Sequence, residues 1–363
     1  MRAGLRRSDT EYVWPTALVP SPEGVRLVYL DLNHWIGLAK AAVGHRDGAR
    51  HRDPLEALRE ANRSGSSAFP LSAEHYMEMS GIADPRQRFD VAAVMEELSG
   101  FASLVSRTVV MRLEVEAAVD AIAHPRPEPY AAVPVLCQGV LQAFGRRGGL
   151  RVRDESGKDV TEAVRRDWRG GPEQFDAWQG DAERQLDRSA LRGPTDAEAP
   201  ELRALGWDPT TARRGANQRA AQEREQADRL AAEPRWRRGR LRDVVSARYI
   251  ALEINEMLAQ ALAARNLELE EVFPDPKYAR RFVDSMPSAD VCVSLITAAH
   301  RNPQTRWTGN DMFDIDALSV AVPYCDIVVT ERHARHALEV AGAPDRAGTA
   351  VMATLEGLAA AIS

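Results

Sequence analysis

An apolar stretch that ends directly at an acidic residue is the feature that most constrains this sequence. Residues 25–30 read Val-Arg-Leu-Val-Tyr-Leu, which is typical of a buried strand, and Asp31-Leu32-Asn33 follows without a loop. In extended geometry residues i and i+2 share a face, so Asp31 and Asn33 are expected to point into one crevice. Ligands of open α/β sheets bind at the carboxyl ends of strands. The sequence therefore predicts an α/β fold with an acidic site beside this strand.

A second group of carboxylates lies on predicted helices. Glu78 follows a short predicted strand at 68–71, and Asp311 and Asp314 are about one helical turn apart, so they project together. Asp314 stands among apolar residues, where an unpaired carboxylate is unfavourable. A divalent cation bound by oxygen ligands would resolve this conflict. Alternatively, Asp311 simply caps its helix.

Two further acids flank the last predicted strand, residues 327–330. Asp326 precedes this strand and Glu331 follows it. Either residue could contribute to the acidic site, and Glu331 could instead complement a helix dipole. Asn33 is assigned to the substrate-binding group, where it would hold a metal-bound water or orient Asp31, and a strand-end turn bond is the alternative.

The middle of the chain differs from its two ends. Residues 146–242 are poor in aliphatic residues and are often broken by Gly and Pro, which predicts solvated helices and loops that are partly disordered. An amphipathic helix is expected to follow over about 243–265, where Val245, Ile250, Ile254, Met257, Leu258 and Leu262 lie close to one face. Strand–helix alternation at both ends predicts an α/β sandwich interrupted by the middle of the chain. The expected parts are a flexible arm over 1–24, the N-terminal part of the α/β domain over 25–125, a charged helical insertion over 126–284, and the C-terminal part over 285–363.

Composition narrows the class of protein. Hydrophobic residues make up 44% and charged residues 28% of the chain, which excludes a wholly disordered protein. The net charge of −6 argues against a dedicated nucleic-acid scaffold, but an enzyme that contacts nucleic acid through one patch is compatible with it. Three cysteines without a close pair favour a reducing compartment. Because no apolar run has the length of a signal peptide or a membrane span, we expect a cytoplasmic protein without membrane contact.

One basic segment combines arginines with a tryptophan. It contains Arg235, Trp236, Arg237 and Arg238, followed by two more arginines. Such a segment can contact phosphates and stack on an unpaired base. The alternative is a solvated helix start balanced by acidic neighbours. Because an acidic site repels a polyanion, some basic surface is needed, and we assign these four residues to substrate binding.

Taken in order, these motifs resemble the PIN-domain superfamily of metal-dependent ribonucleases. The resemblance covers about residues 25–120 and 285–345. In that family a first-strand Asp, a helical Glu, a later helical Asp and an acid by the last core strand surround Mg²⁺ or Mn²⁺. It implies a PIN-like parallel sheet sandwiched by helices. The motifs that carry it are Leu30-Asp31-Leu32-Asn33, Leu71-Ser72 with Glu78 and Gly81, Asn310-Asp311 with Asp314, and Ile327-Val328-Val329-Thr330-Glu331.

The resemblance also implies roles for individual residues. The catalytic acids would be Asp31, Glu78, Asp314 and Asp326, and the metal ligands would include these four together with Asp311 and Glu331. The usual Thr-x-Asp or Thr-Asp of the family is Thr330-Glu331 here, so Asp326 and Glu331 compete for the fourth position. The implied reaction is hydrolysis of RNA phosphodiester bonds by a metal-activated water.

Two other functions stay open at this stage. One is a catalytically inactive PIN-like module for binding or scaffolding, with the insertion as its partner surface. The other is a different Mg²⁺-dependent phosphoryl hydrolase that acts on a small molecule. Besides RNA, the expected partners are a second copy of the chain or an inhibitory protein.

Overall fold

A parallel sheet organises the fold. The computed structural model describes residues 11–206 and 208–362. In this part of the chain the largest sheet has four parallel strands in the order β3 (Ser67–Ala68), β2 (Arg26–Leu30), β7 (Ile327–Val329) and β8 (Ala350–Met352). The register pairs Val28 with Ile327 and Leu30 with Val329. The prediction of an α/β fold is thereby confirmed.

The sheet separates two layers of core because neighbouring residues of a strand face opposite sides. Val28 and Leu30 of β2 belong to one layer, and Leu27 and Tyr29 belong to the other. Sheets buried on both faces read as continuous apolar runs, which is the pattern of this strand. The first layer is completed by the helices α1 (Leu32–Ala42), α2 (Arg52–Arg63), α4 (Pro85–Ser99) and α20 (Leu355–Ile362), with the 3₁₀-helix η1 (Arg46–His51) between α1 and α2.

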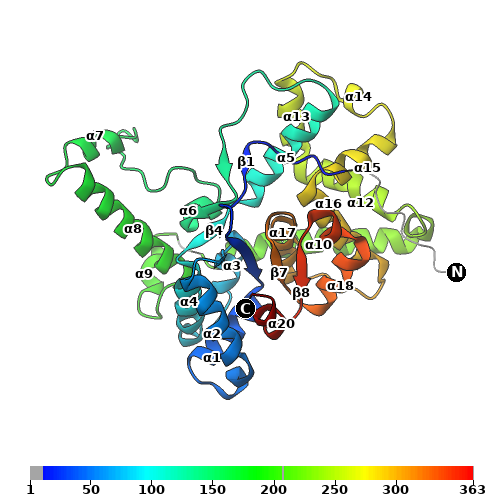
Figure 1. Ribbon diagram of the computed structural model, residues 1–363. Helices are drawn as coiled ribbons and strands as arrows, with labels where there is room; N and C mark the ends of the chain where they lie inside the picture. The colour runs from blue at the N-terminus through cyan, green and yellow to red at the C-terminus, as the bar shows by residue number, and fades with distance from the viewer. Residues whose placement is uncertain (1–10, 207, 363) are drawn as a thin grey trace.

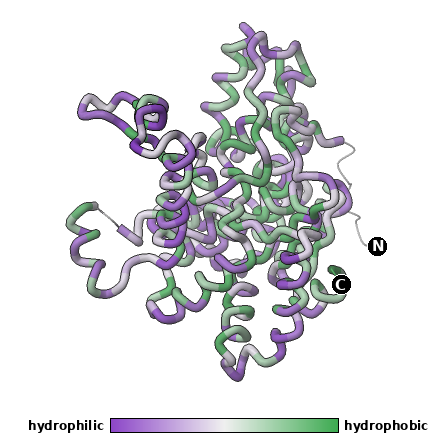
Figure 2. The backbone as a smooth tube through the Cα atoms, turned by 60° about the vertical axis from the view of Figure 1, so that its left-hand side comes forward, coloured by the Kyte–Doolittle hydropathy of each residue, from purple (hydrophilic) through white to green (hydrophobic). Residues whose placement is uncertain are grey.

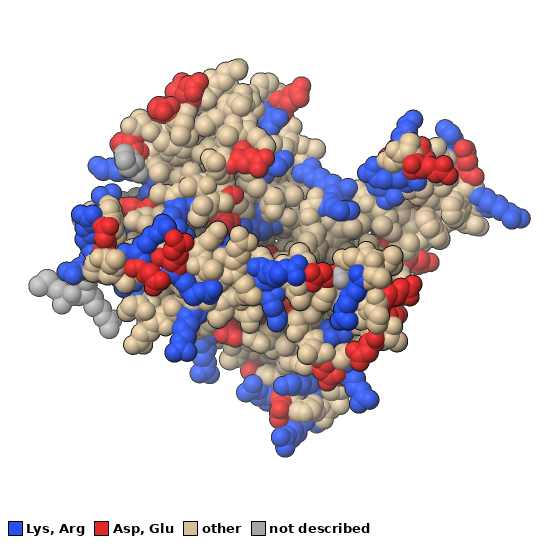
Figure 3. All heavy atoms as spheres, turned by 180° about the vertical axis from the view of Figure 1, so that it is seen from behind, with Lys and Arg blue, Asp and Glu red and all other residues tan. Residues whose placement is uncertain are grey.

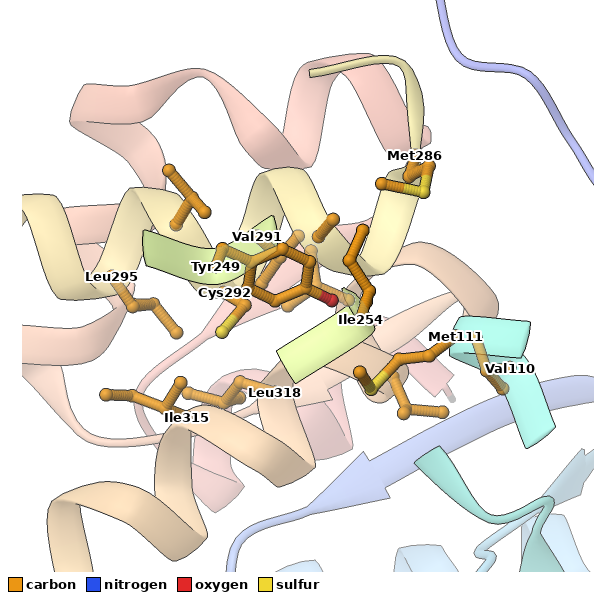
Figure 4. Packing of buried hydrophobic residues seen from close by; sticks show 14 of the residues in the cluster. Val110, Met111, Tyr249, Ile254, Met286, Val291, Cys292, Leu295, Ile315 and Leu318 are labelled. Carbon is orange, nitrogen blue, oxygen red and sulfur yellow. The ribbon is translucent and has the colours of Figure 1, made fainter. Parts of the chain in front are cut away.

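The second layer includes helices from the expected insertion. In Figure 4 the ring of Tyr249 lies between Val291 and Cys292 on one side and Leu318 on the other, and Tyr249 is 4% exposed. The amphipathic helix expected over 243–265 therefore contributes to the core, and α10 (Thr211–Ala232), from the stretch expected to be solvated, packs there as well through Ala216, Ala220 and Leu230. This layer contains α5 (Arg107–Ile122), α10 (Thr211–Ala232), α12 (Leu241–Tyr249), the π-helix η2 (Ile250–Ile254), α13 (Asn255–Ala263), α16 (Pro287–Arg301) and α17 (Gly309–Tyr324).

Only the first half of the expected insertion projects from the body. It forms an arm of α7 (Thr161–Arg166), α8 (Pro172–Arg192) and α9 (Ala199–Ala204) at the left of Figure 1. Figure 2 shows that the chain of this arm is largely hydrophilic, and Figure 3 shows a notch between the arm and the body. Arg188 on α8 pairs with Glu96 on α4, which attaches the base of the arm.

The N-terminal residues that the structure describes are attached to the body. The Tyr12 hydroxyl donates to Asp290 at 2.6 Å, and the Val13 N–H donates to the Ser285 carbonyl at 2.8 Å. Strand β1 (Leu18–Val19) pairs in parallel with β5 (Val133–Pro134). Residues 11–24 are thus not a free arm, and the rest of the expected arm, residues 1–10, lies outside the described residues.

The remaining elements are short or peripheral. They are β4 (Ala102–Leu104), which pairs antiparallel with β6 (Leu136–Gln138), and α3 (Ala73–Met79), α6 (Gly139–Ala143), α11 (Pro234–Arg237), α14 (Leu269–Val272), α15 (Pro276–Ser285), α18 (Arg332–Ala341) and α19 (Ala343–Ala347).

Among the described residues, no single helix is long and apolar enough to span a membrane. One helix pair bent by 114°, residues 277–285 with 287–301, passes that test only in combination.

Partly buried ion pairs fix α10 along α17. Arg219 on α10 pairs with Asp316 on α17 and, at 3.3 Å, with Glu253. Arg107 on α5 contacts the same two acids, at 3.4 Å and 3.0 Å. The His300 ring also bonds Glu223 of α10 at 2.7 Å. These contacts set the position of α10 relative to the first turns of α17, where Asp314 lies.

We predict that Asp316→Ala destabilises the protein by about 3 kcal/mol or more, because it removes a buried carboxylate and leaves two partly buried arginines short of one partner. Urea denaturation followed by circular dichroism measures the change. The control is Glu60→Ala, which removes an exposed pair with Arg63 and should cost less than about 0.5 kcal/mol. Equal effects of the two substitutions would contradict a supporting role for the α10–α17 cluster.

Candidate functional site

The carboxyl ends of β2 and β7 bring two acids together. Asp31 follows β2 directly, and its N–H donates to the Val329 carbonyl at 3.0 Å. The Thr330 hydroxyl donates to the Asp31 carboxylate at 3.3 Å. The Asn33 side-chain amide donates to Glu331 at 2.6 Å. Residues separated by 298 or 299 positions in sequence therefore form one hydrogen-bonded group.

Helix α3 carries Glu78 to the same place. Its N-terminal capping box joins Ser72 and His75, whose Nδ1 accepts from the Ser72 N–H at 3.0 Å. Nε2 of His75 lies 2.8 Å from the Leu30 carbonyl, which can only accept, so Nε2 carries the proton. Burial lowers the pKa of His75 to about 4, which keeps the ring neutral. His75 thus attaches α3 to β2 and sets the position of Glu78 relative to Asp31.

Helix α17 supplies the third acid and a cap. Asp314 lies in its first turns, and Asp311 lies one turn earlier. The Thr308 N–H and hydroxyl donate to one oxygen of Asp311, at 2.6 Å and 2.7 Å. This is the capping role that the sequence left open as the alternative for Asp311.

These side chains line one cavity of about 370 Å³, which we call the acidic cavity. It contains five of the six predicted metal ligands, including Asp311, the capping residue, whereas Asp326 is absent from it. Asn33 also lies at its wall, as predicted. The acidic and polar residues that line it are Asp31, Asn33, Glu78, Asn310, Asp311, Asp314, Glu331, Arg213 and His333.

Burial and mutual repulsion disfavour the charged forms of these acids. Burial, followed by the charges of Asp314 and Asp31, raises the pKa of Glu78 to about 9. Burial, followed by the charges of Asp31 and Glu331, raises the pKa of Asp314 to about 8. Burial and then Glu331 also raise the pKa of Asp31. Without a counter-cation, Glu78 and Asp314 therefore hold their protons at neutral pH.

The side chains of the acidic cavity are of the type that binds a hard divalent cation, but they are not already arranged around one point. Carboxylate oxygens are the donors that Mg²⁺ and Mn²⁺ prefer, and a cation would relieve the repulsion among the acids. Within residues 11–206 and 208–362, however, no three His, Cys, Asp or Glu side chains are already placed to hold one ion. Binding would therefore require rotation of these side chains toward a common point.

One basic residue of the cavity was missed by the sequence analysis. Arg213 comes from α10, and its guanidinium occupies the space that a Cβ at Gly81 would fill. Its charge favours the ionised form of Glu78, although burial and the neighbouring acids outweigh it. Nothing in the local sequence distinguishes Arg213, because its role depends on how α10 packs along α17.

The prediction that Asp326 competes for the fourth acidic position was wrong. Asp326 precedes β7, so it lies at the end of the sheet opposite to Asp31. Its carboxylate accepts a hydrogen bond from the Leu27 N–H at 2.7 Å, which links β7 to β2. Glu331, at the carboxyl end of the same strand, is the acid that lines the cavity.

The basic segment does not reach the acidic cavity. Arg235 and the Trp236 indole both bond Glu233, at 2.7 Å and 2.9 Å, which is the alternative of a locally balanced helix start. Arg237 lines a different cavity, and Arg238 is exposed outside the acidic one. None of these four residues lines the acidic cavity, and their assignment to substrate binding stays a prediction.

Comparisons with known proteins add no family. No family model matches the chain, and no curated protein and no solved structure matches it either. The resemblance to PIN domains therefore depends on the residues of this chain alone.

We predict that Mn²⁺ binds more tightly as the pH rises from 6 to 9. An ion that ligates Glu78 and Asp314 must displace the protons that their raised pKa values retain, so protons compete with the metal. Calorimetric titrations at pH 7 in buffers of different ionisation enthalpy should detect protons released on binding. Asp314→Asn should reduce the number released. An affinity that does not change with pH would contradict this account of the cavity.

Proposed function

We propose that this protein is a metal-dependent endoribonuclease with a PIN-like domain, which hydrolyses RNA phosphodiester bonds at the acidic cavity with Mg²⁺ or Mn²⁺. The observation that carries the proposal is the convergence of Asp31, Glu78, Asp314 and Glu331 on one cavity where they repel one another. Groups with strongly shifted pKa values in a cleft are typical of functional sites. Repulsion of this kind lowers the stability of the folded protein. A cation that binds these acids and takes part in the reaction would relieve it.

The architecture supports the same proposal. A parallel sheet covered by helices on both faces agrees with the fold that the PIN resemblance implies. The acids at the ends of β2 and β7, the Glu on α3 and the Asp on α17 occur in the order that this resemblance requires. An inactive scaffold would not need this set of acids beside Arg213. A Mg²⁺-dependent hydrolase of a small molecule would use the same acids, and the RNA cleavage assay below separates it from a nuclease.

The residues of the acidic cavity would have different roles in the reaction. Asp31, Glu78, Asp314 and Glu331 would hold the ion, which when bound would polarise a phosphate oxygen and lower the pKa of a water. Asn33 holds Glu331, and the Thr330 hydroxyl orients Asp31. The guanidinium of Arg213 would donate to non-bridging phosphate oxygens, for which its planar geometry is suited.

The first test compares Asp31→Asn with Asp326→Asn. Asp31→Asn should reduce cleavage of a mixed RNA substrate with Mn²⁺ by orders of magnitude, since the metal and its water depend on this ligand. Asp326→Asn should still cut, because its oxygen can accept from Leu27 at the other end of the sheet. Parallel reactions with DNA, Mg²⁺ and chelator define the substrate and the ion. Cleavage by Asp31→Asn at the wild-type rate would refute the nuclease assignment.

The same variant separates metal binding from folding. Metal-free Asp31→Asn should melt at the wild-type temperature or slightly higher, because the substitution removes one repelling charge. Mn²⁺ should raise the melting temperature of the wild type more than that of the variant, since a ligand that binds the folded state more tightly stabilises that state more. An equal rise in both proteins would place the ion elsewhere.

A further prediction concerns Arg213. We expect Arg213→Ala to lower kcat for RNA by roughly tenfold or more, the effect of losing a charge-assisted hydrogen bond to phosphate. Affinity for Mn²⁺ should stay the same or rise, because a positive charge leaves the cavity. The control is Arg214→Ala, whose guanidinium bonds Asp208 outside the cavity and which should cleave normally. Equal rates for both variants would remove Arg213 from the site.

A further inference from the structure

A second cavity, of about 590 Å³, lies between α11, α12, α16 and the α18–α19 turn. Five arginines line it against two acids, Asp290 and Glu339. We call it the arginine cavity. Its arginines are Arg237, Arg242, Arg280, Arg301 and Arg346.

Three of these arginines are fixed by buried acids. Arg242 bonds both Asp284 and the fully buried Asp290, and Arg346 bonds Asp290 from the other side. Arg280 pairs with Asp284 at 3.3 Å. These arginines therefore form a preorganised wall whose charge is largely compensated.

The other two arginines are not compensated. Among the described residues, neither Arg237 nor Arg301 has a hydrogen-bond or ion-pair partner. The buried Nε of Arg237 lacks a partner there, as does the hydroxyl of Thr297, which lines the same cavity and is 3% exposed. Burial and the nearby charge of Arg242 lower the pKa of Arg301, as expected where positive charge is in excess. Unsatisfied buried polar atoms beside an excess of positive charge point to an anionic ligand.

We propose that the arginine cavity is a binding site for a phosphate group of the nucleic-acid strand that is cut in the acidic cavity. Guanidinium groups bind phosphate through parallel N–H donors, and the Thr297 hydroxyl adds a further donor. The part of this proposal that identifies the ligand as the substrate strand rests on the proposed function.

A third cavity joins the other two. It has a volume of about 390 Å³ and shares Asp311, Asp314 and His333 with the acidic cavity. Its other end shares four residues with the arginine cavity, which are Ala298, Arg301, Ala337 and Val340. The three cavities therefore follow one another along α16 and α18.

The composition and length of this path suit a nucleotide strand. The wall of the joining cavity is mainly aliphatic, as with Ile315 and Leu318, and it includes Trp307, whose buried indole N–H has no partner among the described residues. From His333 to Val340, α18 rises about 10 Å, roughly the rise of three nucleotides in a duplex and fewer in an extended strand. We assign the joining cavity to the nucleosides between the cut phosphate and the one in the arginine cavity.

The first experiment measures binding without catalysis. Metal-free protein is titrated calorimetrically with adenosine monophosphate and with inorganic phosphate at constant ionic strength. Arg237→Ala and Arg301→Ala should each weaken binding by roughly tenfold. The matched control is Arg240→Ala, three residues from Arg237, whose guanidinium pairs with Asp243 and does not line the cavity. No binding by the wild type, or equal loss in Arg240→Ala, would overturn the proposal.

The second experiment tests whether the bound phosphate belongs to the substrate strand. Adenosine monophosphate should displace a fluorescent RNA from the Asp31→Asn variant, and Arg301→Ala should raise KM for RNA roughly tenfold with kcat unchanged. If adenosine monophosphate binds but does not displace the RNA, the phosphate in the arginine cavity does not belong to the substrate strand. RNA cleavage by the wild type would still support the proposed function in that case. Absence of RNA cleavage would remove the proposed function, and the titrations would still decide whether the arginine cavity binds phosphate.

Discussion

The parallel pairing of β2 with β7 is the constraint on which the rest of the structure depends. It joins residues about 300 positions apart, and its register places Asp31 beside Thr330 and Glu331. A slip of one residue would turn every side chain of β2 to the opposite face, exchange the two core layers and separate Asp31 from its partners. The Asp326 carboxylate bonds the Leu27 N–H at one end of the pair, and the Thr330 hydroxyl bonds Asp31 at the other. The acidic cavity is therefore a consequence of strand register.

A second constraint comes from α10, which carries the basic side of the same cavity. Arg219 and Glu223 attach this helix to α17 and α16, and Arg213 then reaches the acids from its first turn. Gly81 permits this approach, since a larger residue there would meet the Arg213 guanidinium. The ion pairs of α10 thus affect the site indirectly, because they fix how far the guanidinium of Arg213 extends into the acidic cavity.

The sequence was sufficient for the strand and its acid, but not for contacts between distant helices. The apolar run before Asp31 predicted a strand of an α/β fold with acidic residues at its carboxyl end, and the helical spacing predicted that Asp311 and Asp314 project together. Glu331 could also have been preferred over Asp326, because only Glu331 follows its strand and ligands bind at carboxyl ends. The reach of Arg213 was not predictable, since it depends on a segment whose polar composition indicated solvent exposure. Composition describes a helix as a whole, whereas one apolar face is enough to bury it.

Proton retention affects how strongly the acidic cavity would repel the proposed RNA substrate. With pKa values of about 9 for Glu78 and about 8 for Asp314, both groups are neutral at pH 7 in the metal-free protein. A divalent ion that displaces both protons adds two positive charges as two negative charges appear, so the net charge of the cavity does not change. Metal binding would therefore add no further repulsion toward the proposed RNA substrate. Arg213 at the cavity and Arg237 and Arg301 farther along the path would attract the phosphates of that strand.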